Sequence, residues 1–335
     1  MPRYKRLSVC RSYEIVTEYR MVDSTQLAES KGIHRRTGTT FYFATRLLPE
    51  RVRHPTYVLY AFFRIADEIV DDPGDRSPAD QRAELERLRE EALGEREASD
   101  PVLAAFSEVR ETHGIDDAEV NAFVDAMLAD IETDRYETYA DLEAYMHGSA
   151  AAVGHMMTAI MGTDEPDIAR PHAGALGEAF QLTNFVRDVR EDIVERNRIY
   201  LPRTTLADHG VDEEQLARFE MDEAIAGAIR TELRRAEDLY REGVAGIKYL
   251  PEDCQFAVLL AAVLYADHHR LIRSRSLDVL SATPQLSTTR KLYLVARTRW
   301  EWVWNKDPET VFEAVSPLSH ATAHRRGPEE PAPAR

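Results

Sequence analysis

The sequence QLTNFVRDVREDIVERNRIYLP, residues 181–202, organises the rest of this chain. Asn184, Asp188 and Asp192 recur in it every four residues, so on a helix they would line one face. Arg187 stands beside that row. Oxygen-bearing side chains in a row suit a hard cation such as Mg²⁺, which keeps several waters for the phosphates of a substrate. The segment therefore predicts a helix that carries a magnesium and phosphate site.

A second acidic row stands far upstream, in the sequence RIADEIVDD of residues 64–72. Asp67 and Asp71 are again four residues apart, and Arg64 precedes Asp67 by about one helical turn. Two rows of acids, each with an arginine, are suited to a polyanion that is bound through several divalent ions.

The simplest alternative is that each acidic row is only a solvated helix face, which is the usual meaning of clustered acids. The apolar residues among the acids argue against it. They are Ile65, Ile69 and Val70 in the first row, and Phe180, Leu182, Phe185, Val186, Val189 and Ile193 around the second. Because neither helix has a clean polar side, some of these charges must face inward. A charge that faces inward has to be paired or metal-bound, since an unpaired one costs several kcal/mol.

The composition limits the classes of partner. The chain of 335 residues has 42 Lys and Arg against 59 Asp and Glu, a formal net charge of −17. This balance disfavours nucleic acid and anionic membrane surfaces as partners. Many acids with few lysines are typical of proteins adapted to concentrated salt, although a bias in base composition would also replace Lys by Arg.

Cysteine content and hydropathy favour a cytoplasmic protein. Cys10 and Cys254 are too few for a disulfide framework or a metal cluster. No signal peptide is evident in the first twenty residues. The longest weakly polar run, Ser149 to Gly162, is shorter than the about 20 residues of a spanning helix. We expect at most a peripheral position on the inner face of the membrane.

The chain reads as helical throughout, because no stretch shows the period-2 alternation of strands and no Gly-rich phosphate loop appears. Pro49 and Pro55 are expected to bracket a break, and Thr138 or Asp141 to cap a helix. We expect an extension at 1–20, one domain at 21–310 and a disordered tail at 311–335, with Met21 as an alternative start. Helices are expected near residues 57–71, 77–93, 101–113, 116–131, 169–196, 212–248, 252–274 and 288–304.

The two acidic rows and the segments around them resemble the motifs of a known protein family. The chain resembles the squalene and phytoene synthase family, which joins two allylic isoprenoid diphosphates through their C1 ends. The resemblance covers about residues 21–304. It rests on TFYFA at 40–44 with LLP at 47–49, on LYAFFRIADEIVD at 59–71, on residues 145–154, and most strongly on residues 181–202. A single Asp-x-x-x-Asp pattern is weak evidence, but two of them in the right order and context are specific.

The resemblance implies the all-α isoprenoid synthase fold, a helical bundle around a central cavity with the two acidic helices facing each other across its mouth. It assigns the metal ligands to Asp67, Asp71, Asn184, Asp188 and Asp192. It assigns polar positions that face the reacting carbons to Tyr145 and Gln181, which join the four aspartates as catalytic residues. The substrate-binding positions that it implies are Thr40, Phe41, Tyr60, Arg64, Ala150, Val153, Gly154, Arg187, Arg198, Tyr200 and Tyr265.

Three positions depart from the family pattern. The loop between Asp192 and Arg198 is one residue longer than expected, and Glu68 stands where some relatives have aspartate. An arginine is expected after Asp278-Val-Leu, where this chain has Ala282-Thr-Pro, so Arg290 or Lys291 is a candidate to replace it.

The resemblance implies that one prenyl diphosphate ionises and attacks a second, giving a cyclopropylcarbinyl diphosphate that ionises again and rearranges. The RIYLP ending at 198–202, with no membrane helix after it, is similar to phytoene synthases. We therefore expect two geranylgeranyl diphosphates to give phytoene, with Mg²⁺ (Mn²⁺ as an alternative ion), without NADPH, and with peripheral membrane contact for product release.

Several alternatives stay open. They are a squalene or dehydrosqualene synthase that uses two farnesyl diphosphates, a non-catalytic binding relative, and a class I terpene cyclase. The stripe of Ala150, Val153, Gly154 and Met157 either lines the cavity and leaves room for a C20 chain, or only packs against a neighbouring helix. The oligomeric state is not predicted.

Overall fold

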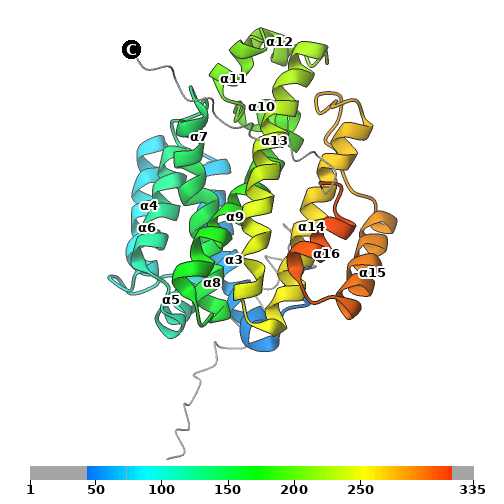
Figure 1. Ribbon diagram of the computed structural model, residues 1–335. Helices are drawn as coiled ribbons and strands as arrows, with labels where there is room; N and C mark the ends of the chain where they lie inside the picture. Colours follow the sequence, from blue (N-terminus) through cyan, green and yellow to red (C-terminus); the bar gives the residue numbers. More distant parts are fainter. Residues whose placement is uncertain (1–43, 73, 319–335) are drawn as a thin grey trace, which may run out of the picture.

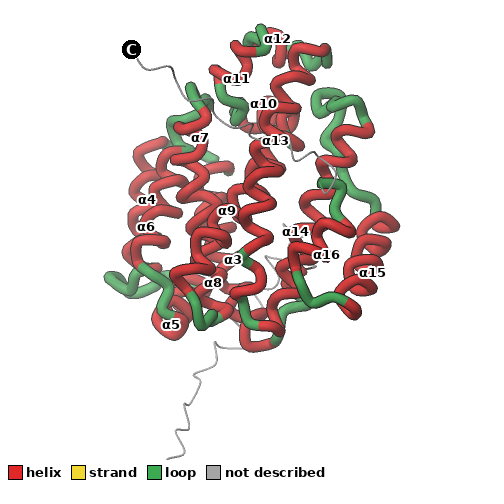
Figure 2. The backbone as a smooth tube through the Cα atoms, viewed as in Figure 1, coloured by secondary structure: helices red, strands yellow, loops and turns green. Residues whose placement is uncertain are grey.

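The computed structural model describes residues 44–72 and 74–318, in which the chain folds into helices (Figures 1 and 2). Within these residues no strand forms, and the one β-bridge joins Arg135 to Ile199. The expectation of an all-α chain is confirmed. The sequence-based predictions for residues 1–20, Met21, Thr40 and Phe41 concern residues outside the described part of the chain.

The helices follow one another through short connections. Their bounds are α3 (Glu50–Asp71), α4 (Pro78–Ala92), α5 (Pro101–His113), α6 (Asp117–Ala129), α7 (Tyr139–Met146), the π-helix η1 (His147–Ala151), α8 (Ala152–Met161), α9 (Pro166–Arg187), α10 (Val189–Arg196), α11 (Arg203–Asp208), α12 (Glu213–Ala217), α13 (Glu223–Ala245), the 3-10 helix η2 (Ile247–Tyr249), α14 (Glu252–Ser274), α15 (Thr288–Trp304) and α16 (Pro308–Val315).

Several helices begin where a side chain can accept a hydrogen bond from a free backbone amide. Ser77 and Thr138 each form a capping box with the aspartate three residues on, which satisfies two amides at once. Asp116 caps α6 and Asp222 caps α13, each by accepting one hydrogen bond from a backbone amide of the first turn. The predicted cap at Thr138 is confirmed, and the predicted bounds of α5, α14 and α15 agree with the structure.

Three predicted boundaries were wrong. Pro55 does not break the chain but lies inside α3, since its ring holds a helical φ and removes only one backbone hydrogen bond. The helix expected at 169–196 is two helices, because Asp188 leaves the helical region with φ −101° and ψ 13° and separates α9 from α10. The helix expected at 212–248 is α12, α13 and η2.

The expectation of a disordered tail was also wrong over its first part. Residues 308–315 form α16, whose Val311, Phe312 and Val315 are buried, and Leu318 beyond it is buried as well. Phe312 stacks at 6.1 Å on the ring of Tyr240 in α13, so apolar burial fixes this segment. Residues 319–335 lie outside the described part of the chain.

Helix α9 crosses the middle of the bundle and packs against α8, η1, α13 and α14 (Figure 1). Small residues make the closest of these contacts possible. A Cβ added to Gly154 would lie 2.3 Å from the carbonyl oxygen of Ala173, and one added to Gly177 would lie 2.4 Å from that of Ala150. Ala150 and Gly154 therefore pack closely against α9.

Candidate active site

The two acidic rows face one polar cavity of about 360 Å³, within the usual size range of ligand pockets. Helix α3 contributes one row, and the second comes from the last turn of α9 and from α10. The two rows, far apart in the sequence, are therefore brought together at one cavity. The predicted residues that line this cavity are Arg64, Asp67, Asp71, Tyr145, Val153, Gln181, Asn184, Arg187, Asp188, Asp192, Arg198 and Tyr200.

Arginines pair with the carboxylates of both rows. Nη1 of Arg64 donates to Oδ2 of Asp67 at 3.0 Å, and Nε of Arg187 donates to Oδ1 of Asp188 at 2.7 Å. Nη1 of Arg198 lies 3.3 Å from Oδ1 of Asp71. The polar cavity therefore holds guanidinium groups that could also bind phosphate oxygens.

A further arginine, which the sequence analysis missed, joins the rows. Nε of Arg196 donates to Asp71 at 3.2 Å, and its Nη1 donates to Asp192 at 3.3 Å. The four-residue spacing between Asp192 and Arg196 was the available signal. Asn197 then takes a left-handed conformation with φ 54°, which ends α10 and turns the chain toward Arg198.

Burial raises the pKa of one carboxyl group in each acidic row. It raises the pKa of Asp67 to about 6, against the opposing effect of Arg64. It raises the pKa of Asp192 to about 7, and the neighbouring charge of Asp188 adds to this shift. A buried carboxylate with a raised pKa is stabilised by any cation that enters beside it.

The donor set of the cavity fits a hard cation. Oδ1 of Asn184 is buried without a hydrogen-bond partner, and Asn184 lines the polar cavity together with several arginines. Within residues 44–72 and 74–318, no three His, Cys, Asp or Glu side chains are gathered closely enough to form a ready metal cluster. Magnesium needs fewer protein ligands than such a cluster, because it is bound by one or two carboxylates together with waters and phosphates.

Asp130, at the end of α6, is a second residue that the sequence analysis missed. Its Oδ2 accepts a 2.8 Å hydrogen bond from the hydroxyl of Tyr145, and Nη2 of Arg198 donates to its carbonyl oxygen at 2.7 Å. Burial raises the pKa of Asp130 to about 7, with Arg198 opposing. Asp134 follows Asp130 at a four-residue spacing, but α6 ends at Ala129, so this spacing does not place the two carboxylates on one helical face.

Aromatic rings form one wall of the polar cavity. Tyr200 stacks on Phe185 with ring centroids 3.8 Å apart, and Tyr145 lies 6.0 Å from Tyr200. Tyr136 completes the cluster at 5.3 Å from Tyr145. The faces of such rings carry negative electrostatic potential and favour a neighbouring cation.

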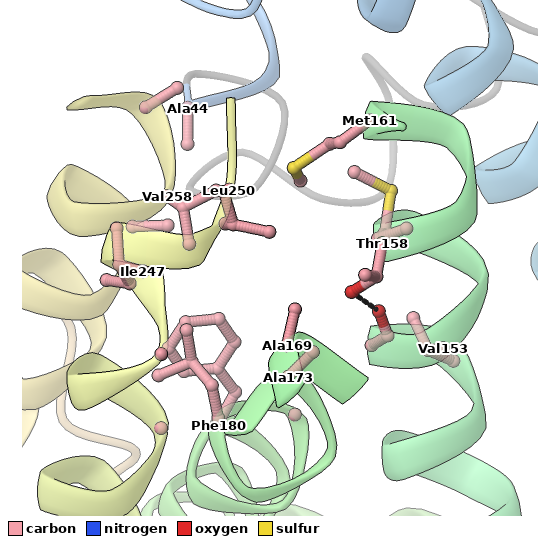
Figure 3. A pocket seen from close by; sticks show the side chains of 18 of the residues that line it. Ala44, Val153, Thr158, Met161, Ala169, Ala173, Phe180, Ile247, Leu250 and Val258 are labelled. Atoms are coloured by element: carbon pink, nitrogen blue, oxygen red, sulfur yellow. Dashed lines mark hydrogen bonds between the residues drawn. The ribbon is translucent and has the colours of Figure 1, made fainter. Parts of the chain in front are cut away.

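An apolar cavity of about 120 Å³ adjoins the polar one (Figure 3). Val153 lines both cavities, so the two meet at this side chain. Met157 and Met161 of α8, Phe180 of α9, and Leu250 and Val258 around α14 form other parts of the wall (Figure 3). The predicted wall residues Val153 and Gly154 thus lie on it, whereas Ala150 lies at the contact with α9.

Two further candidates, Tyr265 and Arg290, are not among the residues that line either cavity. Tyr265 stacks on Phe180 at 4.5 Å, and burial raises its pKa, with smaller effects from Arg187 and Tyr60. Arg290, a candidate for the missing cation, is instead engaged by the buried Asp267 at 2.6 and 3.0 Å. The structure therefore does not free Arg290 for a ligand.

Comparison with known proteins identifies the relatives of this chain. The squalene/phytoene synthase family matches residues 34–290. The phytoene synthase of Rhodobacter capsulatus is 34% identical over 268 residues, which are 78% of this chain and 78% of the relative. That of Cereibacter sphaeroides is 35% identical over 284 residues, 82% of this chain and 79% of the relative. The 15-cis-phytoene synthase of Synechococcus elongatus is 30% identical and covers 79% of this chain and 89% of the relative.

Two solved structures of similar fold are squalene or dehydrosqualene synthases. A dehydrosqualene synthase in complex with a ligand superposes with a TM-score of 0.76 and 28% identity, over 84% of this chain and 98% of that one. Squalene synthase HpnC from Alicyclobacillus acidocaldarius has a TM-score of 0.66 at 24% identity, over 77% of this chain and 98% of that one, and supports the fold alone. The fold is the isoprenoid synthase fold, and the chain belongs to the squalene/phytoene synthase family of prenyl-transferring enzymes.

Proposed function

We propose that this enzyme joins two geranylgeranyl diphosphates head to head, through a cyclopropylcarbinyl diphosphate, and releases phytoene and diphosphate. The observation that carries the proposal is the meeting, at Val153, of an arginine- and carboxylate-rich cavity with an almost wholly apolar one. A prenyl diphosphate has the same two parts, a polyanionic head and a hydrocarbon tail. The names of the relatives from Rhodobacter and Cereibacter support the choice of product.

The arginines would bind the diphosphate and neutralise the charge that develops on its leaving oxygen. Arg64, Arg187, Arg196 and Arg198 all line the polar cavity, where each already pairs with a carboxylate. Guanidinium groups fixed in place by such pairs need little reorganisation as charge develops, which is the condition for electrostatic catalysis.

Magnesium, held between Asp67, Asp71, Asn184, Asp188 and Asp192, would polarise the diphosphate and make it a better leaving group. The unsatisfied Oδ1 of Asn184 and the raised pKa values of Asp67 and Asp192 are consistent with that role. Mn²⁺ is an alternative ion with the same preference for oxygen ligands.

The cavity walls would protect the carbocation. The apolar lining around Met157 and Phe180 would disfavour water, which would otherwise capture the cation. The rings of Phe185, Tyr145 and Tyr200 lie at the polar side, where the allylic carbon would ionise. The reaction would end with the loss of a proton, so no NADPH is required.

A farnesyl-using enzyme is the second candidate, favoured by the likeness to the dehydrosqualene synthase structure. Incubation of the purified protein with geranylgeranyl or farnesyl diphosphate, with and without NADPH, separates the two. We expect a C40 hydrocarbon from geranylgeranyl diphosphate without NADPH. Efficient formation of squalene or dehydrosqualene, with little C40 product, would replace the proposal by the second candidate.

A further inference from the structure

Helix α15 carries an exposed apolar face. Leu292, Ala296, Trp300, Val303 and Trp304 recur at helical spacing and form what we call the tryptophan face. The exposed fractions are 59% for Leu292, 66% for Trp300, 55% for Val303 and 74% for Trp304. The rings of the two tryptophans contact each other, with centroids 6.0 Å apart. Contiguous exposed apolar side chains of this size mark an interaction surface.

The opposite side of the same helix fixes its orientation. Leu294, Thr298 and Trp302 are buried, and Trp302 packs on Phe256 of α14 with ring centroids 6.1 Å apart. Trp302 therefore lies on the buried side of α15, whereas Trp300 and Trp304 lie on its exposed side. The tryptophan face thus points outward because α15 is held from behind, not because the helix is loose.

Basic residues surround this face in an otherwise acidic chain. Residues 288–306 contain five Lys and Arg residues and one acid, Glu301. Arg290 is paired with Asp267, so the other four cations and Glu301 leave a local excess of three positive charges, whereas the whole chain has a net charge of −17. Arg299 lies over the ring of Phe256 at 5.3 Å and Lys306 over that of Trp302 at 5.0 Å, and both side chains are exposed. The local charge of α15 is therefore positive, although the net charge of the whole chain is negative and disfavours anionic surfaces.

The tryptophan face lies one helix away from the apolar cavity. Ala257 and Val258, the neighbours of Phe256, line that cavity, while Phe256 itself meets α15. Glu309, at the start of α16, forms an ion pair with Lys248 of η2 at 3.0 Å. Lys248 lies in the sequence between Ile247 and Leu250, which both line the apolar cavity. Figure 1 shows the end of α15 and the start of α14 at the same end of the bundle.

We propose that the tryptophan face of α15 binds the surface of a lipid bilayer that contains anionic headgroups. Tryptophan rings beside arginine and lysine are the composition of helices that lie in the bilayer interface. Anionic headgroups complement the local positive charge. A second copy of this chain fits less well, because a symmetric contact through α15 would bring its basic residues against their own copies.

This position would place the apolar cavity beside the membrane, where a hydrocarbon product can leave without crossing water. That consequence rests on the proposed function. Binding itself does not, and a test without substrate keeps the two separate.

The test is flotation of the full-length protein with vesicles of phosphatidylcholine alone, or of phosphatidylcholine and phosphatidylglycerol at a 7:3 ratio. We expect the wild type to float with the anionic vesicles. The double variant Trp300→Ser/Trp304→Ser should lose at least tenfold in vesicle partitioning, and Lys291→Gln/Arg299→Gln should lose the preference for anionic lipid. The matched control is Ile168→Ser, which changes another exposed apolar side chain (44% exposed) and should float like the wild type.

Brominated lipids provide a readout that needs no variant. They should quench the fluorescence of the wild type strongly, because two of its three tryptophans would lie in the interface. Absence of both quenching and flotation would overturn the proposal, as would a double variant that floats like the wild type. A wild-type dimer that the tryptophan substitutions convert to a monomer would instead assign this face to self-association.

Discussion

Asp71 and Asp192 belong to different acidic rows, yet they accept hydrogen bonds from the same guanidinium, that of Arg196, at 3.2 and 3.3 Å. One cation thus already lies between the rows and partly offsets their mutual repulsion. The raised pKa of Asp192, about 7, shows that the offset is incomplete because burial outweighs it. The site is therefore organised to receive additional positive charge together with an anionic ligand.

The buried carboxyl of Asp130 should make stability depend on pH. Its pKa is raised from 3.8 to about 7, so the folded chain binds this proton more tightly than the unfolded chain does. Its contribution to the free energy of unfolding is therefore full below pH 4 and is lost as the pH rises through 7. Relative to wild type, Asp130→Asn should gain about 2 kcal/mol in unfolding free energy between pH 5 and pH 8, measured by urea denaturation.

The control for Asp130 is Asp75→Asn, which changes an exposed aspartate outside the cavity. Its difference from wild type should be the same at both pH values. A pH-independent difference for Asp130→Asn would show that its carboxyl is not desolvated in solution.

The sequence predicted the acidic rows well because their four-residue spacing is a local property of helices. It could not predict the bend at Asp188, which lies within a helical pattern that continues on both sides. Nor could it reveal Asp130, whose partners Tyr145 and Arg198 are brought to it only by the packing of α6, α7 and the segment after α10. Spacing within one helix can be read from the sequence, whereas contacts between segments far apart in the chain cannot.

The apolar cavity should set the length of the prenyl chain. Met157→Trp and Val258→Phe each add bulk to the cavity, one from α8 and one from α14, and the added atoms would take the space of the last isoprene unit. An isoprene unit buried at about 0.8 kcal/mol per CH₂ is worth several kcal/mol. We expect geranylgeranyl coupling to fall at least tenfold relative to farnesyl coupling, with a melting temperature that changes little.

Gly154→Leu is the contrasting variant. Its Cβ would lie 2.3 Å from the carbonyl oxygen of Ala173, so the helices α8 and α9 would have to separate. Both couplings should fall together with the melting temperature. An unchanged ratio of the two couplings in Met157→Trp and in Val258→Phe would mean that the chain length is set elsewhere.

The acidic surface should make the protein more stable in salt. A net charge of −17 repels itself, and the Debye length falls from about 10 Å at 0.1 M to about 3 Å at 1 M salt. Screening also weakens exposed ion pairs such as Arg82–Glu132, but each of these contributes little. The melting temperature should rise by about 3 °C or more between 0.1 and 1 M KCl, and a flat curve would argue against salt adaptation.

Composition alone gave a wrong prediction for the first residues of the C-terminal segment, which form part of α16. Residues 311–335 are rich in Pro, Ala, Glu and Arg, a composition that predicts disorder. Within them Val311, Phe312 and Val315 nevertheless make one apolar stripe, short but sufficient when α13 and α14 offer a surface to cover. A pattern of eight residues is too short to be distinguished in sequence from chance.

Product formation in variants of the two acidic rows tests the central claim most directly. Asp67→Asn and Asp188→Asn each remove one carboxylate charge from a different row while keeping the side-chain shape. With geranylgeranyl diphosphate and Mg²⁺, we predict that each variant loses at least 100-fold in product, as the wild type does in EDTA, while the helical circular dichroism spectrum stays unchanged. Full turnover by either variant, or by the wild type in EDTA, would contradict a metal-dependent site built from both rows.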